Sequence, residues 1–356
     1  MNPYTRPIDP HVHLRGSEYK TDFLRIGLQH AADCELSCVL EQPNPVPQLI
    51  SPLVIARRNH LAEEIMVDED ISGLEHHCHI GLTTRPAQVE MALKAAKNRE
   101  HGIRAAKAFW VHSTGDMGLL DPEYQKKVWE IAVAVGYDGP LIQHCEDEAH
   151  FTGDFIVSHP ITHSIRQNTT SEYYQVARQL TNAAAAGFRG TFYVAHVSSP
   201  ATVGFIKEFR SSHPEMKIVM EACWHHFLLN TDDYKTHGNN VKMNPPLREP
   251  ALQERMLEHV LRGDIQILAT DHAPHEPKDL AKPASGIPGI PFWPKGIEIL
   301  RRHGISETLL YEITFGNAKQ VFGLDCVPKK TVAAYDPSMW KPYSFNPYSR
   351  IDGTLS

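Results

Sequence analysis

Short apolar runs alternate with longer amphipathic segments along most of this chain. The runs have the length and nearly continuous hydrophobicity of strands buried in a parallel sheet, and the segments between them have the length of helices. One run surrounds Val12, and the others lie at residues 37–42, 77–84, 103–110, 139–144, 191–196, 217–223 and 265–270. Regular alternation of strand and helix predicts βαβ units and a parallel sheet.

Several of the helical segments have recognisable first residues. Proline loses no hydrogen bond at the first helical position, and serine or aspartate before it can cap the helix. This pattern occurs at Ser51–Pro52, Asp121–Pro122 and Ser199–Pro200, and Pro250 opens a similar segment. Gly136 and Gly263 fit the opposite ends of two of these helices, since glycine tolerates the left-handed stop.

The number of strand–helix units favours an α/β fold of the (β/α)8 TIM barrel type, which has about eight such units. An open doubly wound sheet is the alternative. It is less favoured because "HLRGSEY", after the first strand, lacks the Gly-x-Gly-x-x-Gly phosphate loop. We expect residues 1–356 to form a single barrel domain. An extension from about residue 326, rich in proline, tyrosine and serine, would wrap the surface.

The composition of the 356 residues is that of a globular protein with a core, with 42% hydrophobic and 22% charged residues. The net charge is −7 and no basic block stands out, so nucleic acid is not an expected partner. No apolar run approaches the roughly 18 residues of a membrane span, and no signal peptide is evident, so we expect a cytoplasmic protein without a membrane partner. The six cysteines form no Cys-x-x-Cys pair and are expected to be buried thiols.

Potential metal ligands follow the apolar runs, at the ends that converge on the catalytic face of a barrel. A lone His-x-His, such as His11 and His13, is a weak signal because most such pairs are surface or packed histidines. The remaining strand ends add further polar residues, namely Asn44, Lys107, His144, His196 and Asp271. Four histidines and an aspartate suit zinc but exceed the needs of one tetrahedral ion with an open position. We therefore predict two ions, about 3.5–4 Å apart, that share a bridging hydroxide.

Lys107 lies in "RAAKAFW", among alanines and aromatic residues. Burial lowers the pKa of a lysine and favours the neutral amine. A neutral amine can add carbon dioxide and become a carbamate, which could bridge two metal ions as a carboxylate does. The alternative is an amine that reaches solvent or pairs with a substrate carboxylate, and the sequence leaves both interpretations open.

The chain resembles the dihydroorotases of the amidohydrolase superfamily. The resemblance runs from about residue 9 to about residue 325, and "HVHLR", "NPPLR" and "TDHAPH" are its most specific pieces. The other matching motifs are "EQPN", "AAKAFW", "QHCED", "AHVSS" and "GIPGIP". Because only ten residues precede His11, the accessory β-sandwich of larger relatives would be absent or vestigial.

The resemblance implies roles for the metal ligands. It assigns His11, His13 and Asp271 to the more buried zinc. It assigns His144 and His196 to the second zinc, with carboxylated Lys107 as the bridge. Asp271 would also be catalytic, taking the proton of the bridging hydroxide and passing it to the leaving nitrogen.

The resemblance also implies substrate contacts. Arg15, Asn44 and His275 would bind the α-carboxylate, for which the planar arginine fork is well matched, and Arg248 would make a further contact. The implied reaction is the zinc-dependent, reversible cyclisation of N-carbamoyl-L-aspartate to L-dihydroorotate in pyrimidine synthesis. A homodimer is expected, and association with aspartate transcarbamoylase is a further partnership that the resemblance allows.

Two other functions stay open. One is a different cyclic amidase, such as a hydantoinase or allantoinase, against which Arg15 argues because a neutral hydantoin has no carboxylate to bind. The other is a metal-free scaffold for aspartate transcarbamoylase, against which the complete ligand set argues. The remaining histidine groups, at residues 76–79 and at His225 and His226, are predicted to be structural or supporting residues.

Overall fold

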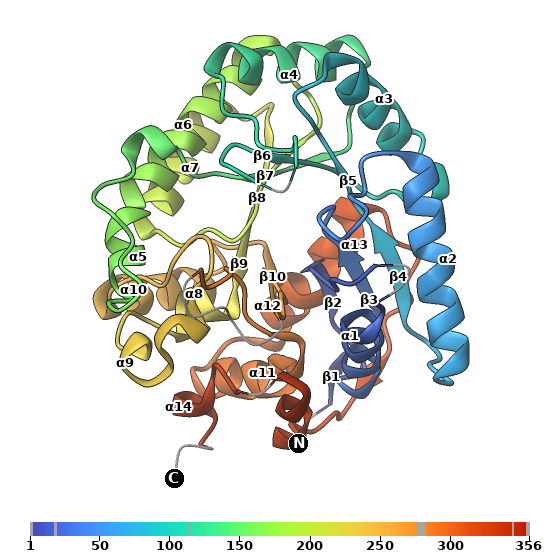
Figure 1. Ribbon diagram of the computed structural model, residues 1–356, viewed down its shortest axis with the longest axis vertical. Coiled ribbons are helices and arrows are strands. Elements are labelled where there is room, and N and C mark those ends of the chain that lie inside the picture. The colour runs from blue at the N-terminus through green and yellow to red at the C-terminus, as the bar shows by residue number, and fades with distance from the viewer. Residues whose placement is uncertain (1–2, 18–19, 114, 276–281, 344, 354–356) are drawn as a thin grey trace.

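The computed structural model describes residues 3–17, 20–113, 115–275, 282–343 and 345–353. Its centre consists of parallel strands surrounded by helices (Figure 1). The central strands are β2 (Ile8–Val12), β3 (Cys38–Glu41), β4 (Glu75–Cys78), β5 (Ile80–Gly81), β6 (Ala106–Phe109), β7 (Pro140–His144), β8 (Thr191–Val194), β9 (Lys217–Cys223) and β10 (Ile267–Ala269). Each falls within or beside an apolar run, so the strand predictions are confirmed.

Two junctions join these strands into a closed barrel. At the first, β4 pairs with β3 and β5 pairs with β6, and His79 between them donates its backbone N–H to Glu41 O at 2.9 Å. Together β4 and β5 occupy one barrel position. At the second, Val12 forms a parallel bridge to His272, and His13 N donates to His272 O at 2.6 Å. The predicted (β/α)8 barrel is therefore confirmed, and the open sheet is excluded.

Helices cover the outside of the barrel (Figure 1). The longer ones are α1 (Asp22–Asp33), α2 (Pro52–Asp68), α3 (Pro86–Lys97), α4 (Pro122–Ala134), α6 (Thr169–Ala186), α7 (Pro200–Ser212), α10 (Pro250–Leu261) and α11 (Trp293–Arg302). The shorter ones are α5 (Thr162–Arg166), α8 (Trp224–Leu228), α9 (Asp233–His237), α12 (Glu307–Tyr311), α13 (Asn317–Phe322) and α14 (Ser349–Asp352). Proline opens α2, α4, α7 and α10 as predicted, and the side chains of Ser51 and Asp121 cap the first two.

The barrel interior is apolar toward the amino ends of the strands. Ile8, Leu40, Ile142 and Tyr193 belong to one buried cluster with Phe322 of α13. A second, larger cluster lies between the strands and the outer helices and includes Val12, Val39 and Trp129. Because apolar side chains fill the amino end, polar side chains can gather only near the carboxyl ends of the strands.

The two ends of the described chain meet beside the barrel. Strand β1 (Tyr4–Thr5) pairs antiparallel with β11 (Lys330–Thr331), and this ladder is the only accessory sheet among the described residues. After it, a 3₁₀ helix (Pro337–Tyr343) and α14 pack against the barrel. Tyr343 and Tyr348 are buried, and the Tyr348 ring stacks on Phe292 with centroids 3.9 Å apart. None of the described helices has both the length and the apolar character that crossing a membrane requires.

Candidate active site

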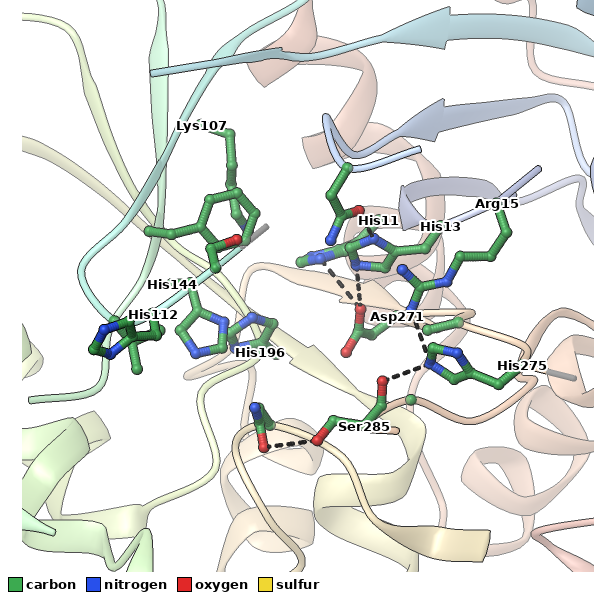
Figure 2. Close-up of a pocket in the computed structure, with 17 residues that line it drawn as sticks. His11, His13, Arg15, Lys107, His112, His144, His196, Asp271, His275 and Ser285 are labelled. Atoms are coloured by element: carbon green, nitrogen blue, oxygen red, sulfur yellow. Dashed lines mark hydrogen bonds and ion pairs between the residues drawn. The ribbon is translucent and has the colours of Figure 1, made fainter. Parts of the chain in front are cut away.

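A cavity of about 270 Å³ opens at the carboxyl ends of the strands. Polar residues dominate its lining, and nearly all of the residues predicted for the site take part (Figure 2). The predicted residues in the lining are His11, His13, Arg15, Asn44, Lys107, His144, His196, Asp271 and His275. Segments from both ends of the chain therefore converge on one cavity, as the barrel topology requires.

The most compact cluster in the cavity consists of His11, His13 and Asp271, whose potential ligand atoms all lie within 4.8 Å of one another. His11 is on β2, His13 follows its end, and Asp271 follows β10. The Nε2 atoms of His11 and His13 lie 3.3 and 2.9 Å from the same Asp271 oxygen, Oδ1. Asp271 has a φ of +47°, a left-handed backbone that is uncommon outside glycine and recurs at functional sites.

The tautomers of the two histidines show why this cluster suits a cation. The Nδ1–H of His11 donates to Glu221 Oε1 at 2.8 Å, and the Nδ1–H of His13 donates to Asn44 Oδ1. In the neutral ring, each Nε2 then carries a lone pair directed at the Asp271 carboxylate. Lone pairs and a carboxylate repel one another unless a proton or a metal ion lies between them, so the donor set fits a metal ion.

A second group of potential ligands lies beside the first. His144 ends β7 and His196 follows β8, with ring centroids 4.6 Å apart, and the His196 ring lies 5.2 Å from that of His11. Lys107, on β6, is fully buried, and its Nζ has no hydrogen-bond partner among the described residues. A buried amine without a hydrogen-bond partner costs folding free energy. We therefore expect a group that is not part of the protein chain to interact with Lys107 Nζ.

The pKa values in the site favour metal-ligand protonation states. Burial lowers the pKa of His13 to about 4 and that of His196 well below its usual range, so both imidazoles are neutral near pH 7. Burial raises the pKa of Asp271, but positive charge or a proton on the His11 and His13 side of the carboxylate outweighs it and would hold that pKa well below its usual range. Burial lowers the pKa of Lys107 to about 8, partly offset by Glu221 and Asp271, so about a tenth of this amine is neutral near pH 7.

Two carboxylates that were not singled out from the sequence orient the histidines. Glu221, in the middle of the apolar run 217–223, binds His11 through Oε1, which also accepts a hydrogen bond from the backbone N–H of His196 at 2.9 Å. Glu146 Oε2 accepts from His144 Nε2–H at 2.8 Å. Carboxylates that hold metal-binding imidazoles fix the ring orientation and raise ligand basicity. A buried glutamate within a strand was the available signal for Glu221.

Arg15 provides a positive charge in the cavity, and its Nη2 lies 3.1 Å from His275 Nε2. In Figure 2 they lie on one side of Asp271, and His144 and His196 lie on the other. Burial lowers the pKa of Arg15 to about 10, so the guanidinium remains charged near pH 7. The Arg15 guanidinium therefore supplies positive charge within the cavity that holds the histidine cluster.

Asn44 lies in the cavity as predicted, whereas Arg248 is not among the described residues of its lining. Asn44 lines the cavity, but its Oδ1 is already bonded to His13, which leaves its amide N–H groups for a ligand. Arg248 is buried and is not among the described residues that line the cavity. Its Nε donates to Ser198 Oγ at 3.0 Å and its Nη1 to Gln167 O at 2.5 Å. This geometry gives Arg248 a structural role and leaves its predicted substrate contact without support.

Several residues in the lining were not predicted, chiefly His112, Asn244 and Ser285. His112 is exposed at the mouth of the cavity, and its Nδ1 lies 2.6 Å from Glu148 Oε1. Ser285 O lies 2.7 Å from His275 Nε2. All three lie on loops, where no periodic pattern identifies which side chains turn inward.

Comparison with known proteins finds relatives that are named dihydroorotase. The dihydroorotase of Halobacterium salinarum is 29% identical over 330 residues, which are 89% of this chain and 71% of that protein. The dihydroorotase of Solibacter usitatus is 30% identical over 275 residues, which are 75% of this chain and 59% of that protein. The chain thus spans about three fifths to seven tenths of the length of these relatives. No family model matches the chain.

Solved structures agree on the fold. The dihydropyrimidinase of Brevibacillus agri NCHU1002 superposes with a TM-score of 0.72 at 21% identity, covering 91% of this chain and 72% of that one. The dihydroorotase of Campylobacter jejuni superposes with a TM-score of 0.68 at 17% identity, covering 92% and 86%. At these identities the likeness shows the barrel fold alone.

Proposed function

We propose that this chain is a dihydroorotase of the metal-dependent amidohydrolase superfamily, because dihydroorotases are its sequence relatives. The reaction would be the reversible cyclisation of N-carbamoyl-L-aspartate to L-dihydroorotate. The observation that carries the proposal is one cavity that combines a cluster of metal ligands with the Arg15–His275 pair. The metal ligands would serve the hydrolysis of a cyclic amide, and the Arg15–His275 pair would hold an anionic ring.

The position of Arg15 favours dihydroorotate over the substrates of a hydantoinase or allantoinase. A half-buried guanidinium such as that of Arg15 is stabilised by an anionic partner, and dihydroorotate carries a carboxylate whose two oxygens match the arginine fork. A neutral hydantoin would leave Arg15 without that partner. Asn44 and His275 would complete the binding of the carboxylate, since both line the cavity beside Arg15.

Two zinc ions are the proposed cofactors. His11, His13 and Asp271 would hold one ion, and His144 and His196 the other. Lys107 would bridge them as a carbamate, formed when its neutral amine adds carbon dioxide and loses a proton. Bound zinc would supply Lewis acidity, which activates water as a nucleophile and polarises the amide carbonyl. The protein's own contribution is a buried, preorganised set of neutral imidazoles and carboxylates.

Asp271 is the proposed proton carrier. Its Oδ1 faces His11 and His13, and as a buried carboxylate with a depressed pKa it is ionised and able to accept a proton. In the hydrolytic direction it would take the proton of the attacking water and deliver it to the ring nitrogen as the C–N bond breaks. In the synthetic direction the same carboxylate would act in reverse.

The complete ligand cluster argues against a non-catalytic scaffold, because a scaffold needs no converging metal ligands. We further propose that residues 1–356 form one barrel domain, and that the protein is a cytoplasmic homodimer. Association with aspartate transcarbamoylase is a secondary proposal, which co-sedimentation of the two purified proteins would test.

The deciding experiment compares dihydroorotate with hydantoin as substrates for zinc-loaded wild type and for Arg15→Met. We expect wild type to prefer dihydroorotate. Arg15→Met should lower kcat/KM for dihydroorotate by about 10–100-fold, the loss of one charged hydrogen-bonding contact, while its rate on hydantoin changes little. Arg302→Met, on the exposed surface of α11, is the matched control. Faster turnover of hydantoin than of dihydroorotate by wild type would overturn the proposal.

A further inference from the structure

A second cluster of soft ligands lies at the carboxyl end of β9, outside the residues that line the cavity. It consists of Cys223, the last residue of the strand, and of His225 and His226 in α8. All three residues are buried, and one potential ligand atom from each lies within 4.8 Å of the other two. From the sequence, the two histidines are predicted to be structural or supporting residues.

The tautomer of His226 is fixed by its surroundings. Its Nε2 lies 2.9 Å from Pro245 O, and since a carbonyl can only accept, Nε2 carries the proton. In the neutral ring Nδ1 is therefore a bare lone pair. That atom is fully buried and has no hydrogen-bond partner among the described residues, so it needs a donor or a cation.

His225 has two buried ring nitrogens that lack a hydrogen-bond partner among the described residues. The residue as a whole is completely buried. Its ring lies against that of His226, with centroids 4.2 Å apart. A buried polar atom left unpaired costs about 1–3 kcal/mol. The accumulation of three such atoms at one place indicates that something outside the protein chain satisfies them.

A contrasting cluster shows that proximity of ligands is not sufficient. Glu41, His76 and Cys78 also come within 4.8 Å of one another. There, however, Arg58 donates two hydrogen bonds to the Glu41 carboxylate, at 2.8 and 2.6 Å, and already supplies the positive charge. No cation of this kind contacts Cys223, His225 or His226 among the described residues. A carboxylate lies close instead, because Glu221 Oε1 is 3.9 Å from Cys223 Sγ.

We propose that Cys223, His225 and His226 bind a divalent metal ion of borderline softness, zinc above all, at a site separate from the catalytic cavity. A thiolate and two imidazoles are ligands that zinc prefers, at about 2.3 Å for sulfur and about 2.0–2.1 Å for nitrogen. Binding would release the Cys223 thiol proton and use the lone pair of His226 Nδ1 and one nitrogen of His225. Glu221 would balance the charge from outside the coordination shell.

The role of this ion would be structural. It would tie the end of β9 to the first turn of α8. Since β9 also carries Glu221, the ion would help to fix the partner of His11. A fixed α8 also keeps His226 on Pro245, in the loop that contributes Asn244 to the cavity lining.

Cobalt substitution tests the proposal because none of the residues assigned to the catalytic centre is a thiolate. The full-length protein, loaded with Co²⁺ in place of zinc, should show a thiolate-to-cobalt charge-transfer band in the near ultraviolet. It should also bind one more equivalent of cobalt than Cys223→Ser. Cys34→Ser, which removes another buried thiol outside these clusters, should keep both the band and the extra equivalent.

Two outcomes overturn the proposal. One is a fully loaded wild type without the band, which would mean that water or nothing fills the site. The other is a band that persists in Cys223→Ser, which would assign it to a different thiol. If Cys223→Ser does not fold, X-ray absorption of zinc-loaded wild type decides, since a sulfur neighbour at about 2.3 Å is required and its absence refutes the site. Dihydroorotase activity is not a readout here, so the two proposals fail separately.

Discussion

The Nδ1 atom of His11 lies 2.8 Å from Oε1 of Glu221, and both side chains are buried. This hydrogen bond fixes which nitrogen of His11 faces Asp271. It also explains a carboxylate in the middle of a buried strand, since Tyr193 and the backbone of His196 satisfy its remaining acceptors. The pair links β9 to His11 on β2, a proposed metal ligand.

Glu221→Gln should weaken metal binding at the His11 position by about 10–100-fold, because an amide keeps the volume but loses the charge that makes His11 a better ligand. Zinc titration against a competing chelator measures the effect. Glu75→Gln, at the amino end of the barrel, is the matched control. Equal zinc affinity in Glu221→Gln and wild type would refute this role.

Lys107→Ala should lose the bridging group and with it most activity and one of the two zinc ions. Adding a short carboxylate such as acetate or propionate should restore part of both, because the free anion can occupy the space of the missing carbamate. Zinc content and dihydroorotate turnover, each with and without the added carboxylate, are the measurements. Lys94→Ala on exposed α3 controls for loss of a lysine, and a Lys107→Ala protein that keeps both ions and its rate would remove the carbamate from the mechanism.

Asp271→Asn should reduce kcat by about 10²–10⁴-fold, the usual contribution of a positioned proton carrier. Because Asp271 is also a proposed ligand, turnover must be measured at saturating zinc and set against measured metal content. Asp264→Asn, which lies before β10 and away from the cavity lining, should behave like wild type. Undiminished kcat in a fully metallated Asp271→Asn protein would contradict proton transfer by this residue.

His30 should make stability depend on pH. Burial lowers its pKa from 6.5 to about 4, and its Nδ1 lies 2.7 Å from Tyr343 OH. The unfolded chain therefore binds more protons between these values, so this contribution is full above about pH 6.5 and is lost as pH falls toward about 4. In His30→Gln, the loss of unfolding free energy from about pH 7 to about pH 5 should be smaller by about 1–2 kcal/mol. Denaturant titrations at both pH values measure it, and identical losses in variant and wild type would show that His30 does not titrate as described.

The sequence was sufficient for the strands because each is a continuous apolar run, and a strand covered on both faces has little choice of residue. It also located the potential ligands, since His144, His196 and Asp271 stand where such runs end. The interruption at His79, where β4 gives way to β5, was not predictable, because "HCHIGL" continues as one run across the break.

Other features depend on contacts between distant segments. Nothing near Arg248 in the sequence indicates that its guanidinium binds Ser198 and the Gln167 carbonyl instead of facing the cavity. Likewise, a tail rich in proline and tyrosine looks like surface chain, yet Tyr343 and Tyr348 are buried against the barrel. Local pattern reports what a residue can do, whereas tertiary packing decides which neighbour it meets.

The parallel bridge between Val12 and His272 has a consequence for biosynthesis. His11 and His13 leave the ribosome early, whereas Asp271 is synthesised more than two hundred residues later. The nascent chain therefore carries only part of the proposed set of metal ligands for most of its synthesis. A metal ion could therefore be bound by the full set only after the barrel has closed. Such an ion would stabilise the closed barrel as well as serve the chemistry, because it would connect β2 to the segment that follows β10.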